Sequence, residues 1–450
     1  MHRNTAQLVC RLGFVLCCLL PTCITAGWVT YRSLPGVMLS QKQEWEQVLS
    51  QKLGLRVTCE KVDYWRPEAA ELTNVALFDE ETGAPIGTIA SLEVIREEKQ
   101  WKLIGWQVVV ESVQLPQLRN LLQQRWLRMQ QTAESLPCEI WIREFTLRDA
   151  ERSLTLVDLN GTWKQGAEGP IAELLFRLPE ADPQLPRGRI VVQRNRQTSP
   201  PSSRWQFDSG SLPLPCSLAT AGWPEVKHLG IGATFVGRLE FVQAGEQSTG
   251  RLSGTLHNVD LDALISEQFA HQLSGLATCK IDDATIEGGR LTSIRGTVQA
   301  RDGWIGRSLL LAAAEHLQLN CPPVESLASG TGAVSFRQLS LGFGLRGGEL
   351  NLTGSADALR AGVLLATANG SLLELPPRHQ ATSLGLLRTL VPEQEWQVPA
   401  ARSTQSLARF LPLPDLVPST TADRRRLDHV RIQLQPTQNP QGQAVKQPFR

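Results

Sequence analysis

The chain has 450 residues, with 45 Lys and Arg against 44 Asp and Glu, which leaves a formal net charge of +1. This balance argues against a nucleic-acid binder, which needs a strongly basic surface. Nine Cys and seven His form neither a CxxC motif nor a close His pair, which argues against a zinc or dithiol centre. The length allows roughly two to four domains.

An apolar segment without charges runs from Leu12 to Val29, after Arg3 and Arg11. Its length is close to the roughly 20 residues that cross a bilayer as a helix. The preceding arginines keep residues 1–11 in the cytoplasm, so we expect a single-pass anchor at 12–30 in the inner membrane and an extracytoplasmic remainder. The alternative is a signal peptide cleaved after Ala26, which exports the chain as well. The apolar side chains that we expect in the membrane are Leu12, Phe14, Leu16, Leu19, Leu20, Ile24 and Trp28.

Two helices are predicted beyond this segment. The first has Ser40 as its N-cap and Gly54 as its C-terminal stop, with Trp45, Leu49 and Leu53 on one side. The second runs from Pro116 to about residue 133 and has an apolar face. Such apolar stripes usually pack on a protein core.

From Arg56 onward the apolar residues mostly follow a period of two, which is typical of antiparallel strands joined by tight turns. The fold class is therefore mainly β with a few helices (α+β), built as elongated antiparallel units. We expect a helix plus β unit at 36–178, a Pro/Ser-rich loop or linker at 179–216, a second β unit at 217–410, and a mostly disordered tail at 411–450.

Two pairs of similar segments suggest an internal repeat whose sequence has diverged. The segment that starts at Val113 resembles the one that starts at Val259, and each follows a strand and opens a helix-like stretch. The second pair of similar segments shares a predicted Gly-Gly turn, at Gly288-Gly289 and at Gly347-Gly348. Gly-Gly permits the positive φ values of two-residue hairpins. Glu287 would then face Arg290, and Arg346 would face Glu349, opposite charges in swapped order.

One strand is especially regular, with large apolar side chains on one side and little bulk on the other. A one-sided apolar sheet must cover that side with protein or with another apolar material. Two interpretations stay open, a plain sandwich core and a groove for acyl chains. The residues that would line such a groove are Leu339, Leu341, Phe343, Leu345, Leu350 and Leu352.

The order of these features resembles the AsmA-like proteins, relatives of the TamB and bridge-like lipid-transfer proteins. The resemblance covers most of residues 1–390 and consists of apolar spacing with Gly and Asp, at residues 53–57, 72–79, 250–261, 273–275, 288–291, 348–354 and 370–373. It implies an inner-membrane helix that holds an elongated periplasmic β-sheet curled into an apolar groove, and a role in envelope biogenesis or phospholipid transport. The chain is short for a protein that bridges two membranes alone.

No catalytic motif stands out in the sequence. The segment from Gly230 to Gly237 has Phe235 where a dinucleotide loop needs its third glycine, so a β strand is expected there. Asp260 and Asp262 are predicted helix caps rather than a catalytic pair. We therefore expect a protein that is not an enzyme and has no cofactor and no metal, with the membrane, phospholipid and envelope proteins as partners. The alternative is a structural or protein-interaction role with closed β-sandwich units and no lipid.

Overall fold

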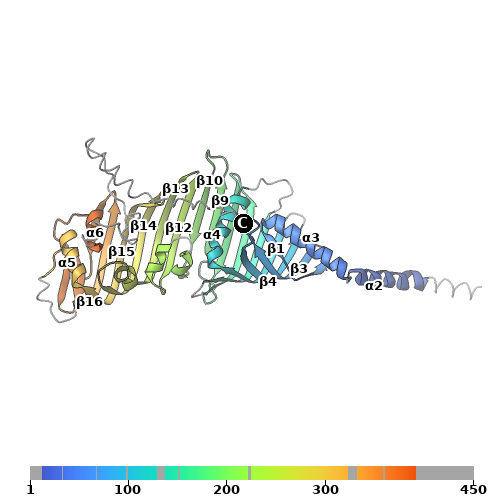
Figure 1. The fold of residues 1–450 in the computed structure, drawn as a ribbon, viewed down its shortest axis with the longest axis horizontal. Coiled ribbons are helices and arrows are strands. Elements are labelled where there is room, and N and C mark those ends of the chain that lie inside the picture. The colour runs from blue at the N-terminus through green and yellow to red at the C-terminus, as the bar shows by residue number, and fades with distance from the viewer. Residues whose placement is uncertain are drawn as a thin grey trace, which may run out of the picture.

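The chain folds into one long β-sheet with helices along it and at its two ends (Figure 1). The computed structural model describes residues 13–32, 34–66, 68–97, 100–128, 137–149, 153–220, 224–322, 332–357 and 360–391. The twenty strands of these residues belong to a single sheet. The predicted mainly β fold is confirmed, and the predicted tail at 411–450 lies outside the described residues.

The first half of the sheet contains β1 (Arg56–Thr58), β2 (Lys61–Arg66), β3 (Ala69–Phe78), β4 (Pro85–Arg96), β5 (Trp101–Glu111), β6 (Cys138–Arg148), β7 (Ser153–Gln165), β8 (Pro170–Arg177), β9 (Gly188–Asn195) and β10 (Ser202–Asp208). The second half contains β11 (Leu214–Pro215), β12 (Thr234–Ala244), β13 (Gln247–Asp260), β14 (Leu273–Glu287), β15 (Arg290–Gly306), β16 (Ala333–Arg346), β17 (Glu349–Gly354), β18 (Val363–Thr367), β19 (Gly370–Glu374) and β20 (Ala381–Thr382).

The helices are shorter than the strands in total length. The α-helices are α2 (Leu20–Arg32), α3 (Pro35–Leu53), α4 (Leu115–Leu121), α5 (Arg307–His316) and α6 (Ser383–Leu390). Short 3₁₀ or π segments are η1 (Val15–Leu19), η2 (Ser112–Gln114), η3 (Leu122–Trp126), η4 (Cys216–Ala219), η5 (Pro224–Leu229) and η6 (Asp262–Ser266). Figure 1 shows α3 and α2 extending from one end of the sheet, and α5 and α6 at the other end.

Most strands follow one another along the sheet in chain order and pair antiparallel. Among the described pairs, β5 and β6 are parallel, because the chain returns between them through η2, α4 and η3. Parallel neighbours need such a crossover, whereas antiparallel neighbours need only a turn. Within the described residues the two end strands do not pair with each other, so the sheet is open.

The strand register aligns apolar residues across nearly the whole sheet. One row of directly paired positions crosses fifteen strands, from β3 to β20, and consists of Ala70, Val94, Leu103, Ile140, Gly161, Leu174, Ile190, Phe207, Leu239, Leu252, Ala284, Ile294, Leu345, Leu350 and Ala381. Because side chains alternate along each strand, this row fixes one entire side of the sheet as apolar. We call this side the apolar face and the other side the polar face.

A line of kinks crosses the sheet from β3 to β7 without interrupting the apolar face. Inward-facing residues there are three positions apart instead of two, as in Leu72 and Val75 of β3, and these positions stay paired from strand to strand. Every second strand has a polar residue with positive φ at the kink, namely Asn74, Gln107 and Asp158. Asn and Asp tolerate this conformation better than bulky residues, and such irregularities bend and twist a sheet.

The helices cover the apolar face near the two ends of the sheet. Near the N-terminal end, Leu49 of α3 is buried among strand residues, and Trp45, Leu53, Leu115 and Leu118 pack around that cluster. Near the C-terminal end, residues of α5 and α6 pack on β15 to β19. A smaller cluster between them includes Leu159, Phe176, Leu212 and Leu214. Helix and sheet thus bury each other's apolar sides in the two larger cores, whereas strands and connecting segments form the smaller one.

The hairpin predictions are confirmed in detail. Gly288 and Gly289 have φ values of 56° and 77°, and Gly347 and Gly348 have 56° and 88°. Glu287 pairs with Arg290, and Arg346 pairs with Glu349. The segments after Val113 and Val259 also become helical, as α4 with η3 and as η6. Local turn chemistry is therefore sufficient to place these elements.

Two boundary predictions are wrong. The first helix ends at Gly54 as expected (φ 64°), but it begins at Pro35 instead of after Ser40, because Pro35 suits the first helical turn. Residues 179–216 are not a loop or linker throughout, since they contain β9 and β10, which join the sheet on both sides. Pro200 and Pro201 lie in the turn between these two strands, whereas Ser202 and Ser203 begin β10, in which apolar and polar residues alternate.

Candidate functional site

The central part of the apolar face has large side chains that belong to none of the three hydrophobic clusters. These residues form what we call the central strip, and they are Trp205, Leu239, Phe241, Leu252, Ile286 and Leu291. Each is half-buried, whereas residues of the flanking clusters such as Leu72 and Leu365 are fully buried. The strip is thus the section of the apolar face that the described helices cover least.

The strand register brings the strip together. Trp205 of β10 pairs with Phe241 of β12, which pairs with Gly250 of β13. Gly250 in turn pairs with Ile286 of β14. Because Gly250 has no side chain, Phe241 and Ile286 flank it directly, and a Cβ at Gly250 would lie 3.5 Å from Ile286 Cβ and 3.7 Å from Phe241 Cδ2. The result is an unbroken apolar surface over five strands.

The six groove candidates from the sequence all lie on the apolar face, but most of them are core residues. Leu345 and Leu350 are each 4% exposed and belong to the C-terminal cluster. Leu339, Leu341 and Leu352 pack against the same cluster. Phe343 is half-buried and outside the cluster, opposite Gly296 and Leu352. Covering by α5 and α6, which the strand pattern does not reveal, makes the first five unavailable as an open surface.

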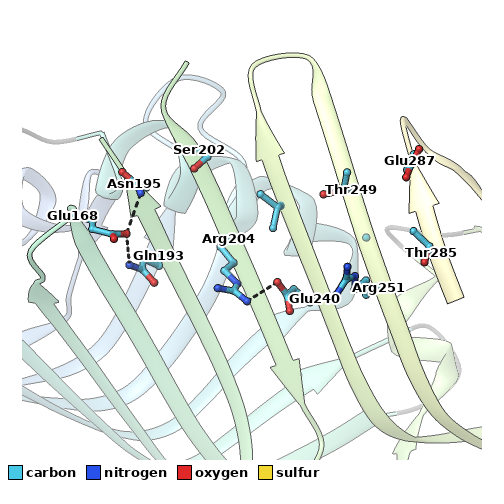
Figure 2. Close-up of a pocket in the computed structure, with 12 residues that line it drawn as sticks. Glu168, Gln193, Asn195, Ser202, Arg204, Glu240, Thr249, Arg251, Thr285 and Glu287 are labelled. Carbon is cyan, nitrogen blue, oxygen red and sulfur yellow. Dashed lines mark hydrogen bonds and ion pairs between the residues drawn. The ribbon is translucent and has the colours of Figure 1, made fainter. Parts of the chain in front are cut away.

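The polar face of the same central strands has a pocket of ≈ 550 Å³ (Figure 2). Arg204 and Glu240 form an ion pair of 2.7 Å across β10 and β12. Glu168 accepts hydrogen bonds from Gln193 (3.4 Å) and Asn195 (3.0 Å). These groups largely satisfy one another at an exposed surface, where such pairs contribute little to stability. The pocket is therefore a solvated, polar hollow that is unsuited to acyl chains.

A second hollow of ≈ 510 Å³ lies on the polar face at the line of kinks. It is lined by the residues that the kinks turn outward, including Trp106, Gln107, Arg143 and Glu144. The Arg143 guanidinium lies 5.3 Å from the Trp106 ring centroid, a cation–π contact. The hollow is thus a consequence of the bend, closed in part by a structural side-chain contact.

The residues predicted to lie in the membrane are helical where they are described. Phe14, Leu16, Leu19, Leu20 and Ile24 are all exposed, at 48% to 62% of their surface. Leu12 and the side chain of Trp28 lie outside the described residues. A search of the described helices finds none that is both long and apolar enough to span a bilayer. The anchor stays a prediction.

The cysteine chemistry of the described residues favours structural thiols. Burial raises the pKa of Cys59, Cys138, Cys216 and Cys279 to about 11. Thiols with such pKa values are protonated at neutral pH and are poor nucleophiles. Within the described part of the chain, no group of three or more His, Cys, Asp or Glu residues is placed to hold a metal ion. Asp260 accepts a hydrogen bond from the Asp262 N–H (3.0 Å), but the N-cap of η6 is Leu261 and has no side-chain cap, so the prediction that Asp260 and Asp262 are helix caps is wrong in detail.

The sequence does contain the signal for the central strip. Trp205 and Phe207 alternate with polar residues, as do Leu239 and Phe241. However, Pro200 and the neighbouring serines are typical of a loop, which hides this signal. In addition, the alternation of side chains does not indicate which apolar faces are covered by helices.

Comparison of the chain with protein-family models and with curated proteins found no match.

Proposed function

We propose that this protein is a membrane-anchored, exported AsmA-like protein that binds lipid along the apolar face of its sheet and acts in envelope assembly or lipid transport, without catalysis. The observation that carries the proposal is the apolar row from Ala70 to Ala381. Its fourteen steps, at roughly 4.8 Å between strands, span about 67 Å. The two ends of this row lie in the helix-covered cores, and the central strip lies between them.

The openness of the sheet supports a lipid rather than a second sheet as the cover. The alternative of closed β-sandwich units requires two facing sheets, whereas all described strands belong to one. Large apolar surfaces that stay accessible mark contacts with other molecules or with lipid. The central strip supplies such a surface between two helix-covered cores, so lipid chains are expected to bind there first.

Photo-crosslinking tests this proposal directly. A photoreactive phenylalanine analogue is placed at Leu252 of the full-length protein, expressed in cells whose lipids are radiolabelled, and lipid adducts are measured after illumination. The matched control is the neighbouring Arg251, which is exposed on the polar face of the same strand. We expect lipid adducts at Leu252 and few at Arg251.

The outcomes separate lipid binding from a purely structural role. Equal labelling at both positions would indicate nonspecific contact with membrane lipid and would contradict the proposal. Protein adducts at Leu252 without lipid adducts would replace the proposed ligand with a partner protein. Lipids that co-purify with the detergent-free protein, identified by mass spectrometry, provide a second readout of the same surface.

A further inference from the structure

Three arginines gather at the edge of the apolar face beside the central strip. Arg194 and Arg196 are two residues apart at the end of β9, and Arg194 Nη1 donates to Ser203 Oγ at 2.8 Å. Arg196 Nη2 donates to the Leu127 carbonyl oxygen at 3.2 Å, which brings the residue after Leu127, Arg128, to the same place. Leu127 is fully buried, so this contact is fixed by packing.

The register places Arg194 on the apolar face at the boundary of the strip. Arg194 pairs with Ser203, Ser203 pairs with Gln243, and Gln243 pairs with Ser248. On each of these four strands, the row of apolar side chains is therefore followed by a polar residue near the strand end. Two residues inward on the same strands lie Val192, Trp205, Phe241 and Gly250. An apolar surface with a polar, cationic rim on one edge has the layout that an amphiphile requires.

Two of these three charges, those of Arg128 and Arg194, have no acidic partner within the part of the chain that the structure describes. Burial lowers the pKa of Arg194, and the neighbouring guanidinium groups of Arg128 and Arg196 lower it further. The nearby Glu168 carboxylate is engaged by Gln193 and Asn195 on the polar face. The rim therefore has an excess of positive charge that an anion would relieve.

Two further donors on the apolar face lack acceptors. The indole nitrogens of Trp163 and Trp205 are buried, and neither has a hydrogen-bond partner among the described residues. Both belong to one cross-strand row, in which Trp163 pairs with Ala172, Ala172 with Val192, and Val192 with Trp205. Trp126 stacks on Trp163 with a centroid distance of 6.1 Å, and Arg128 follows two residues later. Protein atoms already cover both nitrogens, so they are not sites for a surface ligand, and the assignment of a ligand rests on the arginines.

We propose that the guanidinium groups of Arg128 and Arg194, at this rim, bind the phosphate group of a phospholipid whose acyl chains lie along the central strip. The inference rests on the proposed lipid-binding function and adds the site at which the phosphate group of the lipid is held. Guanidinium groups form strong, charge-assisted hydrogen bonds with phosphate oxygens.

Native mass spectrometry of the full-length protein in a mild non-ionic detergent tests this site. The probes are phosphatidylglycerol and diacylglycerol with the same acyl chains, which differ by the phosphoglycerol group. We expect the wild-type protein to bind phosphatidylglycerol about tenfold more tightly than diacylglycerol, equivalent to about 1.4 kcal/mol. In the double variant R128Q/R194Q this preference should fall to about one, with unchanged binding of diacylglycerol.

Two further variants control for folding and for general charge. Arg128→Gln alone changes an exposed side chain and should reduce the preference by a few-fold without affecting the fold. Arg251→Gln removes an exposed arginine from the polar face (Figure 2) and should leave the preference unchanged. Loss of the preference in Arg251→Gln to the same extent would overturn the assignment to the rim.

The remaining outcomes distinguish this inference from the function on which it rests. Equal binding of the two probes by the wild type would refute the phosphate site and leave lipid binding intact. Binding of neither probe would refute both. If inorganic phosphate alone binds as tightly as phosphatidylglycerol, the ligand is a free phosphate, and the lipid assignment of the rim is overturned.

Discussion

Truncating two leucines on the same face of the sheet should have very different effects on stability. Leu365 is fully buried in the C-terminal cluster, whereas Leu252 is half-buried in the central strip and outside all clusters. Leu→Ala removes about three carbon atoms' worth of apolar burial, at roughly 0.8 kcal/mol per CH₂ group. At Leu365 this loss and the cavity that remains should cost about 3–5 kcal/mol in the free energy of unfolding.

At Leu252 the same truncation should cost only about 1 kcal/mol. Its side chain is only partly buried, so less apolar burial is lost than at Leu365, and the space left behind opens to solvent instead of forming a closed cavity. The two effects therefore differ by roughly 2 kcal/mol or more. Leu252→Ala should, however, weaken lipid capture, because it removes part of the proposed binding surface.

Hydrogen exchange measured by mass spectrometry can resolve both effects in the full-length protein. Local opening free energies are compared for β18, which contains Leu365, and for β13, which contains Leu252, in the wild type and each variant. A loss at β13 as large as that at β18 would show that the strip is a closed core. That result would refute the argument that the central face is open for a ligand.

Three further predictions concern stability. Gly254→Ala should destabilise the sheet more than Gly288→Ala. A Cβ at Gly254 would lie 2.5 Å from the Val236 carbonyl oxygen, whereas a Cβ at Gly288 would have no atom within 4 Å. Thermal unfolding measured by circular dichroism compares the two variants, and an equal decrease in melting temperature would contradict this steric account. Thr382→Ala should lower the local opening free energy of α6 by about 1 kcal/mol, because the Thr382 hydroxyl accepts a hydrogen bond from the Gly385 N–H at 3.0 Å. Unchanged hydrogen exchange in α6 would exclude this capping role. Cys59 has a folded-state pKa of about 11 against an ordinary value of 9.0, so its stabilising contribution is complete below pH 9 and is lost as the pH rises towards 11. Cys59→Ala should therefore reduce the fall in unfolding free energy between pH 9 and pH 11, and an unchanged fall would refute this contribution.

Much of the local structure follows from the sequence because it depends on neighbouring residues alone. Gly288-Gly289 and Gly347-Gly348 make tight turns since glycine adopts the required positive φ values, and Gly54 ends α3 for the same reason. The alternation of apolar residues correctly assigns Leu339 to Leu345 to one side of a strand. Even the steps of three residues, such as Leu72 to Val75, are visible in the sequence.

The structural effect of these three-residue steps is evident only in the tertiary structure. A single step of three reads as an irregular strand, but paired steps in five neighbouring strands form one line across which the sheet bends. Likewise, Pro200 and its neighbours predict a loop because they mark a turn, and only the pairing of β9 and β10 shows that the sheet continues on both sides.

The two-sided character of the strands and the positions of their turns can be predicted from the residues alone, since both follow from side-chain alternation and backbone sterics. Which apolar residues stay accessible was decided by tertiary packing alone. Leu345 and Phe241 have equivalent patterns along their strands, yet α5 and α6 pack at the end of the sheet that contains Leu345, whereas Phe241 lies beyond the clusters. Covering depends on contacts between residues far apart in the chain, and no local pattern encodes it.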